Sequence, residues 1–223
     1  MRILTLDGAG TDASATLLEL CDESLVRIGH FVLPTRGGAE RLASVVSGLL
    51  GSASWDVASL ALIAAVTGPG SFTGLRATLS LAQGLALGLT MRADLPLHGV
   101  TRAEALRRSV GDTGGRPLWC VTIARRDRVF IETDAGSGPR GTMLDALPSP
   151  AEAVLLAGDA AALVAARIAR AIDSGVERPT PEAIAEVALD RLSGRLPPLA
   201  ALPLYVDAPE AKLPAGGLRP APV

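Results

Sequence analysis

Histidine and cysteine, two of each, are scarce in this chain of 223 residues. His30 and His98 lie in separate segments, so the paired histidines of a zinc site on one helix are missing and we expect no metal ion. These counts do not exclude a Ser–His–Asp or Cys–His arrangement, but no nucleophile stands on a recognisable turn between strand and helix. Cys21 and Cys120 are far apart in sequence, and we expect each to be a reduced, buried thiol.

The chain also lacks an excess of positive charge. Its 21 Lys and Arg residues against 23 Asp and Glu residues give a formal net charge of -2. A protein that binds nucleic acid by itself normally shows a basic face that displaces counterions from the phosphates. We therefore expect any nucleic acid to be held through a partner, and we interpret the short basic runs at 107–108 and 125–128 as solvated faces.

Long apolar runs are missing as well. The one stretch of suitable length, residues 72–89, contains Gly, Ser, Thr, Gln and Arg, which argues against a membrane span. Residues 1–6 pass directly into a strand, without the basic region, apolar core and small-residue cleavage site of a signal peptide. We expect a cytoplasmic protein without membrane contact.

What the chain has is a glycine-rich turn between a buried strand and a long helix. Residues 60–66 are a continuous apolar run, typical of a strand buried on both faces. Gly68 and Gly70 flank the proline of the turn, and Ser71 suits the N-cap of the helix. Such a turn can hold a phosphate, so these three residues are weak candidates for nucleotide binding. We favour a role in turn geometry and close packing, because no lysine follows as in a Walker loop.

Asp7 is a second weak candidate. It ends the first apolar strand, where folds of the actin and hexokinase type place a carboxylate that orients a metal-bound nucleotide. Gly8, Ala9 and Gly10 follow it and supply no hydroxyl group. An aspartate in a glycine-rich turn is also common turn chemistry, and we favour that role.

The helix over residues 72–89 is apolar on more than one side. Leu75, Leu79 and Ala82 share one stripe and are expected to face the core. The side away from this stripe carries Gly84 and Gly88, each of which costs roughly 1 kcal/mol against Ala, so packing must offset them. We predict that another protein packs there; the alternative is cover by the rest of the chain. The predicted partner interface consists of Arg41, Val45, Arg76, Ala77, Ser80, Leu81, Gly84 and Gly88.

The predicted elements form two α/β halves with mixed sheets, each beginning with hairpin strands. The first half is expected to hold strands over 3–6, 15–20, 25–32, 60–66 and 95–100 and helices over 42–50 and 72–89. The second is expected to hold strands over 118–123, 129–133 and 153–156 and helices over 101–108, 160–172 and 181–192. We expect two lobes, residues 1–100 and 101–200, and a proline-rich tail over 201–223 that is anchored at 204–206.

The segment from Gly68 through Arg76 reads Gly-Pro-Gly-Ser-Phe-Thr-Gly-Leu-Arg, and it is the signature of the bacterial TsaB (YeaZ) family, residue for residue. Further segments that resemble the family lie in the same order along the chain. They are Leu6–Asp7, Ala82–Ala86, Leu97–Val100, Ala124–Arg125 and Leu204–Val206.

This resemblance implies an actin-like (ASKHA) fold of two RNase H-like lobes and a non-catalytic subunit without a cofactor. TsaB-like proteins pair with TsaD, which transfers threonylcarbamoyl to the adenosine beside the anticodon of tRNAs reading ANN codons. TsaE, an ATPase, joins the pair, and tRNA is bound only through the complex. The family contact corresponds to residues 38–50 and 72–88, and a homodimer is expected for the isolated protein. The alternative is a weak ATPase or a glycoprotease-like hydrolase of the same fold.

The chain departs from the family pattern at four places. The family usually has Asp-Thr-Ser where this chain has Asp7–Ala9, and His-Ser-Glu where it has Gly38–Glu40. Ile123 replaces an aspartate, and Asp207 stands where arginine often follows the tyrosine-containing strand. These changes weaken the case for nucleotide binding.

Overall fold

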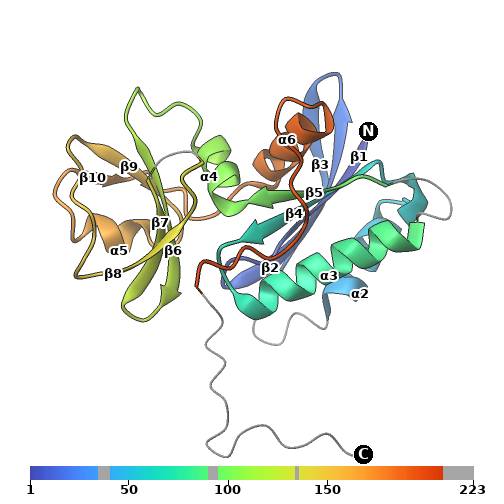
Figure 1. The fold of residues 1–223 in the computed structure, drawn as a ribbon. Helices are drawn as coiled ribbons and strands as arrows, with labels where there is room; N and C mark the ends of the chain where they lie inside the picture. Colours follow the sequence, from blue (N-terminus) through green and yellow to red (C-terminus); the bar gives the residue numbers. More distant parts are fainter. Residues whose placement is uncertain (35–40, 90–94, 134–135, 208–223) are drawn as a thin grey trace, which may run out of the picture.

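The computed structural model describes residues 1–34, 41–89, 95–133 and 136–207 and has two five-stranded sheets (Figure 1). The first sheet has the order β3-β2-β1-β4-β5. Its strands are β1 (Arg2–Asp7), β2 (Asp12–Cys21), β3 (Ser24–Pro34), β4 (Leu62–Gly68) and β5 (Leu97–Thr101). β1 pairs antiparallel with β2 and parallel with β4, so the sheet is mixed, as expected.

Helices cover both faces of this sheet, which explains the uninterrupted apolar sequence of β4. All seven residues of β4 are buried. The helices α2 (Leu42–Ser52) and α3 (Phe72–Leu89) lie side by side below the sheet in Figure 1, and α6 (Pro181–Leu192) lies above it. A short 3-10 helix, η2 (Val57–Ser59), leads into β4. No helix of the described residues is long and apolar enough to cross a membrane.

The second sheet has the order β8-β7-β6-β9-β10 when read in the same direction as the first. Its strands are β6 (Leu118–Arg125), β7 (Arg128–Glu132), β8 (Arg140–Met143), β9 (Val154–Ala157) and β10 (Ala171–Asp173). The antiparallel and parallel pairs follow one another as in the first sheet. The two sheets therefore share one topology, although no sequence repeat links them.

The predicted helix over residues 160–172 is wrong in its length. The structure has the short helix α5 (Ala161–Ala165) and then the strand β10, which pairs with β9. Arg170 turns the chain with a φ of 72°, which a helix does not allow. The alanines favour a helix, but pairing with the sheet decides the structure of residues 171–173. Cys21 also differs from expectation, since it is exposed, whereas Cys120 is buried.

The chain after the second sheet returns to the first lobe. Ile184 and Val187 of α6 and Ala201 belong to the core that the first sheet builds. Leu204 is anchored as expected, because its N–H donates to the Thr67 carbonyl at 2.8 Å. The ranges 1–100, 101–200 and 201–223 remain a proposal, and grouping by packing would assign α6 and the segment 199–207 to the first lobe.

Between the lobes lies α4 (Arg102–Val110), which the sequence locates well (Figure 1). The Oγ1 of Thr101 accepts a hydrogen bond from the N–H of Glu104, and the carboxylate of Glu104 accepts one from the N–H of Thr101. These two bonds are the expected capping box. The next residue, Arg102, is 1% exposed and bonds to the Ala9 carbonyl in the first lobe.

Candidate functional site

The glycine-rich turn is closed by contacts within the protein. The N–H of Ser71 donates to the Ala9 carbonyl at 2.8 Å, and the Oγ of Ser71 accepts from the N–H of Gly74 at 3.3 Å, as expected for an N-cap. A Cβ added to Gly70 would lie 2.0 Å from the Ala9 oxygen, and one added to Gly8 would lie 2.4 Å from the Gly74 oxygen. The glycines thus let two turns touch, and the Ser71 amide is used by the protein instead of a phosphate.

Asp7 lies beside this contact and serves its own turn. Its Oδ1 accepts a hydrogen bond from the N–H of Ala9 at 2.9 Å. Burial raises the pKa of Asp7, and the nearby guanidinium groups of Arg102 and Arg178 oppose that rise. The structure therefore brings together Asp7, Gly68, Gly70 and Ser71, the four weak candidates for nucleotide binding. Whether a nucleotide binds there stays a prediction.

A charged pair that the sequence does not predict lies near Asp7. Arg102 is 1% exposed, and its Nη2 donates to the Oδ2 of Asp159 at 3.0 Å. Its Nη1 donates to the Ala9 carbonyl at 3.4 Å, and the Oδ1 of Asp159 accepts from the N–H of Ile123. The guanidinium thus joins both lobes. The capping box locates Arg102 at the start of a helix, but nothing in the sequence pairs it with a residue 57 positions away.

The two histidines do not meet. His30 is on β3 and bonds to Thr16, and His98 is on β5. Burial lowers the pKa of both, so both favour the neutral form. No group of His, Cys, Asp and Glu side chains among the described residues could hold a metal ion. Burial also raises the pKa of Cys120 to about 12, which suits a structural thiol.

The outer face of α2 and α3 is built mostly from small, uncharged residues. α2 has no charged residue, and Arg76 is the one charged residue of α3. The exposed positions of the two helices are Ala43, Ser44, Ser47, Gly48, Gly51, Ser52, Phe72, Thr73, Arg76, Ser80, Gly84, Leu87 and Gly88. Helices that face water normally show charged side chains there. We call this surface the α2–α3 face.

No described part of the chain lies in front of the glycines of the α2–α3 face. A Cβ added to Gly48, Gly51, Gly84 or Gly88 would meet no atom of the described residues within 4 Å. The alternative that other described parts of this chain cover Gly84 and Gly88 therefore finds no support. Small residues at these positions let the backbone of a second helix come close.

The residues predicted to form a partner interface lie on these two helices or at their start. Arg41, Arg76, Ser80, Gly84 and Gly88 are exposed. Val45, Ala77 and Leu81 are half-buried, and Val45 and Leu81 pack in part against the core. The predicted contact at residues 38–40 lies outside the described residues. That these residues contact another protein remains a prediction.

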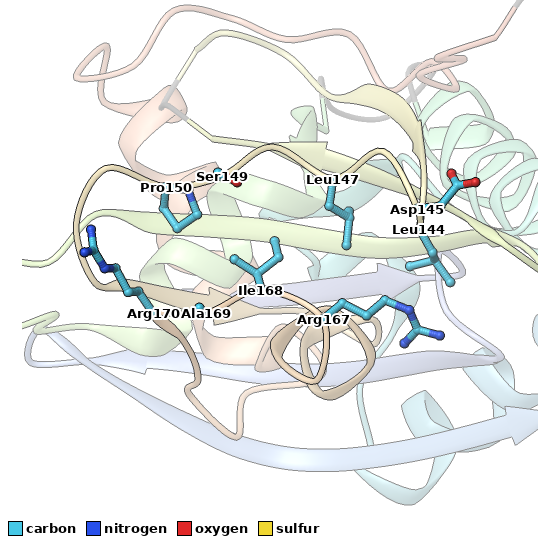
Figure 2. Close-up of a pocket in the computed structure, with 9 residues that line it drawn as sticks. All are labelled: Leu144, Asp145, Leu147, Ser149, Pro150, Arg167, Ile168, Ala169 and Arg170. Carbon is cyan, nitrogen blue, oxygen red and sulfur yellow. The ribbon is translucent and has the colours of Figure 1, made fainter.

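A hollow of about 280 Å³ lies in the second lobe, between the β8–β9 connection and the turn after α5 (Figure 2). Leu147 and Ile168 are near its middle, and Arg167 and Arg170 stand toward its two ends (Figure 2). Both arginines donate to backbone carbonyls, of Leu163 and Ala151. The hollow contains none of the residues that the sequence predicts to bind a nucleotide or a partner.

Comparison with known proteins places these features in context. The family model described as TsaD, tRNA N6-adenosine threonylcarbamoyltransferase, matches residues 33–185. An uncharacterized protein of Mycobacterium tuberculosis is 33% identical over 219 residues, which is 94% of this chain and 93% of that protein. The tRNA threonylcarbamoyladenosine biosynthesis protein TsaB of Escherichia coli is 36% identical over 117 residues, covering 51% of this chain and 47% of that protein.

Two solved structures share the fold over nearly their whole length. YeaZ from Pseudomonas aeruginosa has a TM-score of 0.69 and 23% identity, with 92% of this chain and 99% of that chain covered. A structure described as an uncharacterized protein with similarity to peptidase YEAZ, from the same organism, has a TM-score of 0.71 with the same identity and coverage. The expected two mixed sheets flanked by helices are thereby confirmed, and the chain shares this fold with YeaZ.

Proposed function

Because the chain belongs to the TsaB (YeaZ) family, we propose that it is a non-catalytic subunit in the synthesis of threonylcarbamoyladenosine in tRNA. It pairs with a TsaD-like subunit, which transfers threonylcarbamoyl to the adenosine adjacent to the anticodon in tRNAs reading ANN codons. A TsaE-like ATPase joins the pair, and tRNA contacts the chain only through the complex. We place this complex in the cytoplasm.

The observation that carries the proposal is the α2–α3 face. Two adjoining helices expose mostly small, uncharged residues, and none of the described residues fills the space in front of Gly84 and Gly88. Helices that face water normally carry charged side chains, so two adjoining helices with a single charged residue indicate a site of protein association. The same face supports self-association of the isolated chain, in which a second copy takes the place of the TsaD-like partner.

The closed turn and the buried charge near Asp7 support a non-catalytic role. Within the first lobe Ser71 and Gly70 pack against Ala9, and between the lobes the buried Arg102 donates to Ala9 and pairs with Asp159. A nucleotide would have to displace this pair and find new donors for its phosphates. Breaking a buried ion pair is costly, because it leaves an uncompensated charge.

The experiment that tests pairing is co-purification of the chain with the TsaD-like protein of the same organism. We expect the wild-type chain to form a complex and Gly84→Arg to lose it, since the new side chain occupies the space of the partner helix. Ala162→Arg is the matched control, because Ala162 is an exposed small residue on α5 in the second lobe. Circular dichroism verifies that both variants fold. Equal complex formation by both variants would contradict the proposed surface.

The alternative function is a weak ATPase or a glycoprotease-like hydrolase of the same fold. Titration calorimetry of the isolated chain with ATP and magnesium separates it from the proposed one. We expect no saturable binding. Tight binding that Asp7→Ala removes would favour the ATPase instead.

A further inference from the structure

An exposed aromatic pair stands where α3 begins. Phe72 is 54% exposed and Tyr205 is 51% exposed, and their ring centroids lie 5.9 Å apart. The chain has only one Tyr and three Phe residues, and large aromatic side chains are usually buried to a high degree. These two exposed rings come from segments far apart in the sequence and lie side by side. This arrangement indicates a binding site for a ligand or partner and not a part of the core.

Arg76 is fixed by this pair from two sides. Its guanidinium carbon lies 3.8 Å from the centroid of the Phe72 ring, one helical turn earlier on α3. Its Nε donates a hydrogen bond to the hydroxyl of Tyr205 at 3.1 Å. An arginine normally loses much rotamer freedom when it binds, and one that is already held loses less.

The two Nη groups of Arg76, which make no hydrogen bond to a described residue, suit an acidic ligand. Apart from the bond to Tyr205, Arg76 makes no hydrogen bond or ion pair with any described residue. The two Nη groups of an arginine match the two oxygens of a carboxylate in a parallel, bidentate arrangement. No acidic residue lies on α2 or α3, and Asp207, close to Tyr205 in sequence, is bound by Arg128 at 2.6 and 2.7 Å. The charge of Arg76 is therefore left for a partner.

We propose that Arg76, held by Phe72 and Tyr205, is the anchor for an Asp or Glu side chain of the protein that covers the α2–α3 face. This inference rests on the proposed function and adds the chemistry of the partner. We expect the carboxylate to belong to a protein for two reasons. Phe72, Arg76 and Tyr205 adjoin the mostly uncharged exposed surface of α3, and aromatic rings lie on two sides of the Arg76 guanidinium. A net charge of -2 argues against an RNA phosphate as the ligand, because proteins that bind nucleic acid by themselves normally carry excess positive charge.

Tyr205 makes the C-terminal segment part of the binding site. The segment 199–207 crosses the first lobe toward the start of α3 (Figure 1), and along its course it bonds to Gly99, Gln83 and Thr67. These bonds fix the position of Tyr205, and Tyr205 in turn orients Arg76. Tyr205 is thus a positioning residue, and removing its hydroxyl group leaves the ring contact with Phe72 in place.

Calorimetric titration with the purified TsaD-like protein tests the anchor. We expect Arg76→Ala to weaken binding about tenfold or more, as for a central arginine of an interface, and Arg76→Lys to recover only part of that loss. Tyr205→Phe is expected to weaken binding about threefold in the wild-type background and to have no effect in the Arg76→Ala background. Arg126→Ala, an exposed arginine on the β6–β7 turn, is the control and should bind as the wild type does.

The outcomes separate this inference from the proposed function. Unchanged affinity in Arg76→Ala and Tyr205→Phe, together with loss of binding in Gly84→Arg, would overturn the anchor and leave the pairing intact. Failure of the wild-type chain to bind the TsaD-like protein would overturn both. If Arg76→Ala binds the TsaD-like protein normally but the resulting complex binds tRNA more weakly, the ligand is an RNA phosphate and the protein carboxylate is wrong.

Discussion

The guanidinium of Arg102, 1% exposed, lies 3.0 Å from the carboxylate of Asp159 and joins the first helix after the first sheet to the loop after β9. A second bond from Arg102 reaches the Ala9 carbonyl in the first lobe. One buried arginine thus connects the turns that follow the first strand of one sheet and the fourth strand of the other. This pair and the Arg178–Asp12 ion pair both join the lobes, and the charge of Arg102 opposes the rise of the pKa of Asp7.

We expect Asp159→Asn to lower the free energy of unfolding by about 3 kcal/mol, because Arg102 then remains buried without its counter-ion. The double variant Arg102→Met with Asp159→Asn should recover part of this loss, since it removes the unpaired charge. Urea denaturation monitored by circular dichroism measures both. Equal midpoints for the single and the double variant would show that the ion pair has no such role.

Asp7 should reduce the stability of the chain at neutral pH. Burial raises its pKa in the folded state, so the ionised carboxylate is less favourable in the folded chain than in the unfolded one. The stability that this group contributes is greatest below its ordinary pKa and falls as the pH rises through the folded pKa. We therefore expect Asp7→Asn to raise the thermal midpoint at about pH 7 and to leave it nearly unchanged at about pH 3.

Thermal melts at both pH values test this, with Glu152→Gln as an exposed control. A variant that melts below the wild type at neutral pH would mean that attraction to Arg102 and Arg178 outweighs burial. The pKa of Asp7 would then lie below its ordinary value in the folded chain, contrary to the expected rise.

Gly84→Ala should separate stability from association. A Cβ at this exposed helical position meets no atom of the described residues within 4 Å, so the isolated chain should gain about 0.5 to 1 kcal/mol in unfolding free energy. Affinity for the TsaD-like protein should fall, since the methyl group enters the space of the partner helix. Thermal melting and titration calorimetry measure the two effects. Higher stability with unchanged affinity would place the close helix contact away from Gly84.

Much of the fold follows from local sequence. The apolar run before Gly68, the capping residues Thr101 and Thr180, and the proline at position 181 locate β4, α4 and α6 within a few residues. The helix expected over residues 160–172 is wrong because β10 takes its structure from pairing with β9, which no local pattern records. That α6 packs on the first sheet is likewise a property of the tertiary structure.

The candidate site likewise has features that local sequence predicts and features that depend on tertiary contacts. The exposed glycines of α3 follow from helical periodicity, which separates Gly84 and Gly88 from the stripe of Leu75 and Leu79. Two contacts of the site join segments that are distant in the sequence: the Arg102–Asp159 pair and the hydrogen bond between Arg76 and Tyr205. Composition and spacing do not predict such contacts. The sequence also does not predict that Phe72 is exposed, because an apolar residue at the start of a helix is usually assigned to the core.

Hydrogen exchange with mass spectrometry, on the chain alone and mixed with the TsaD-like protein, tests the central claim most directly. If the α2–α3 face docks the partner, amide exchange should slow in residues 42–52 and 72–88 and in the segment 199–207 when the complex forms. Exchange in α5 and β10 should stay as it is. Complex formation that slows exchange only in the second lobe, and leaves α2 and α3 unchanged, would contradict the account.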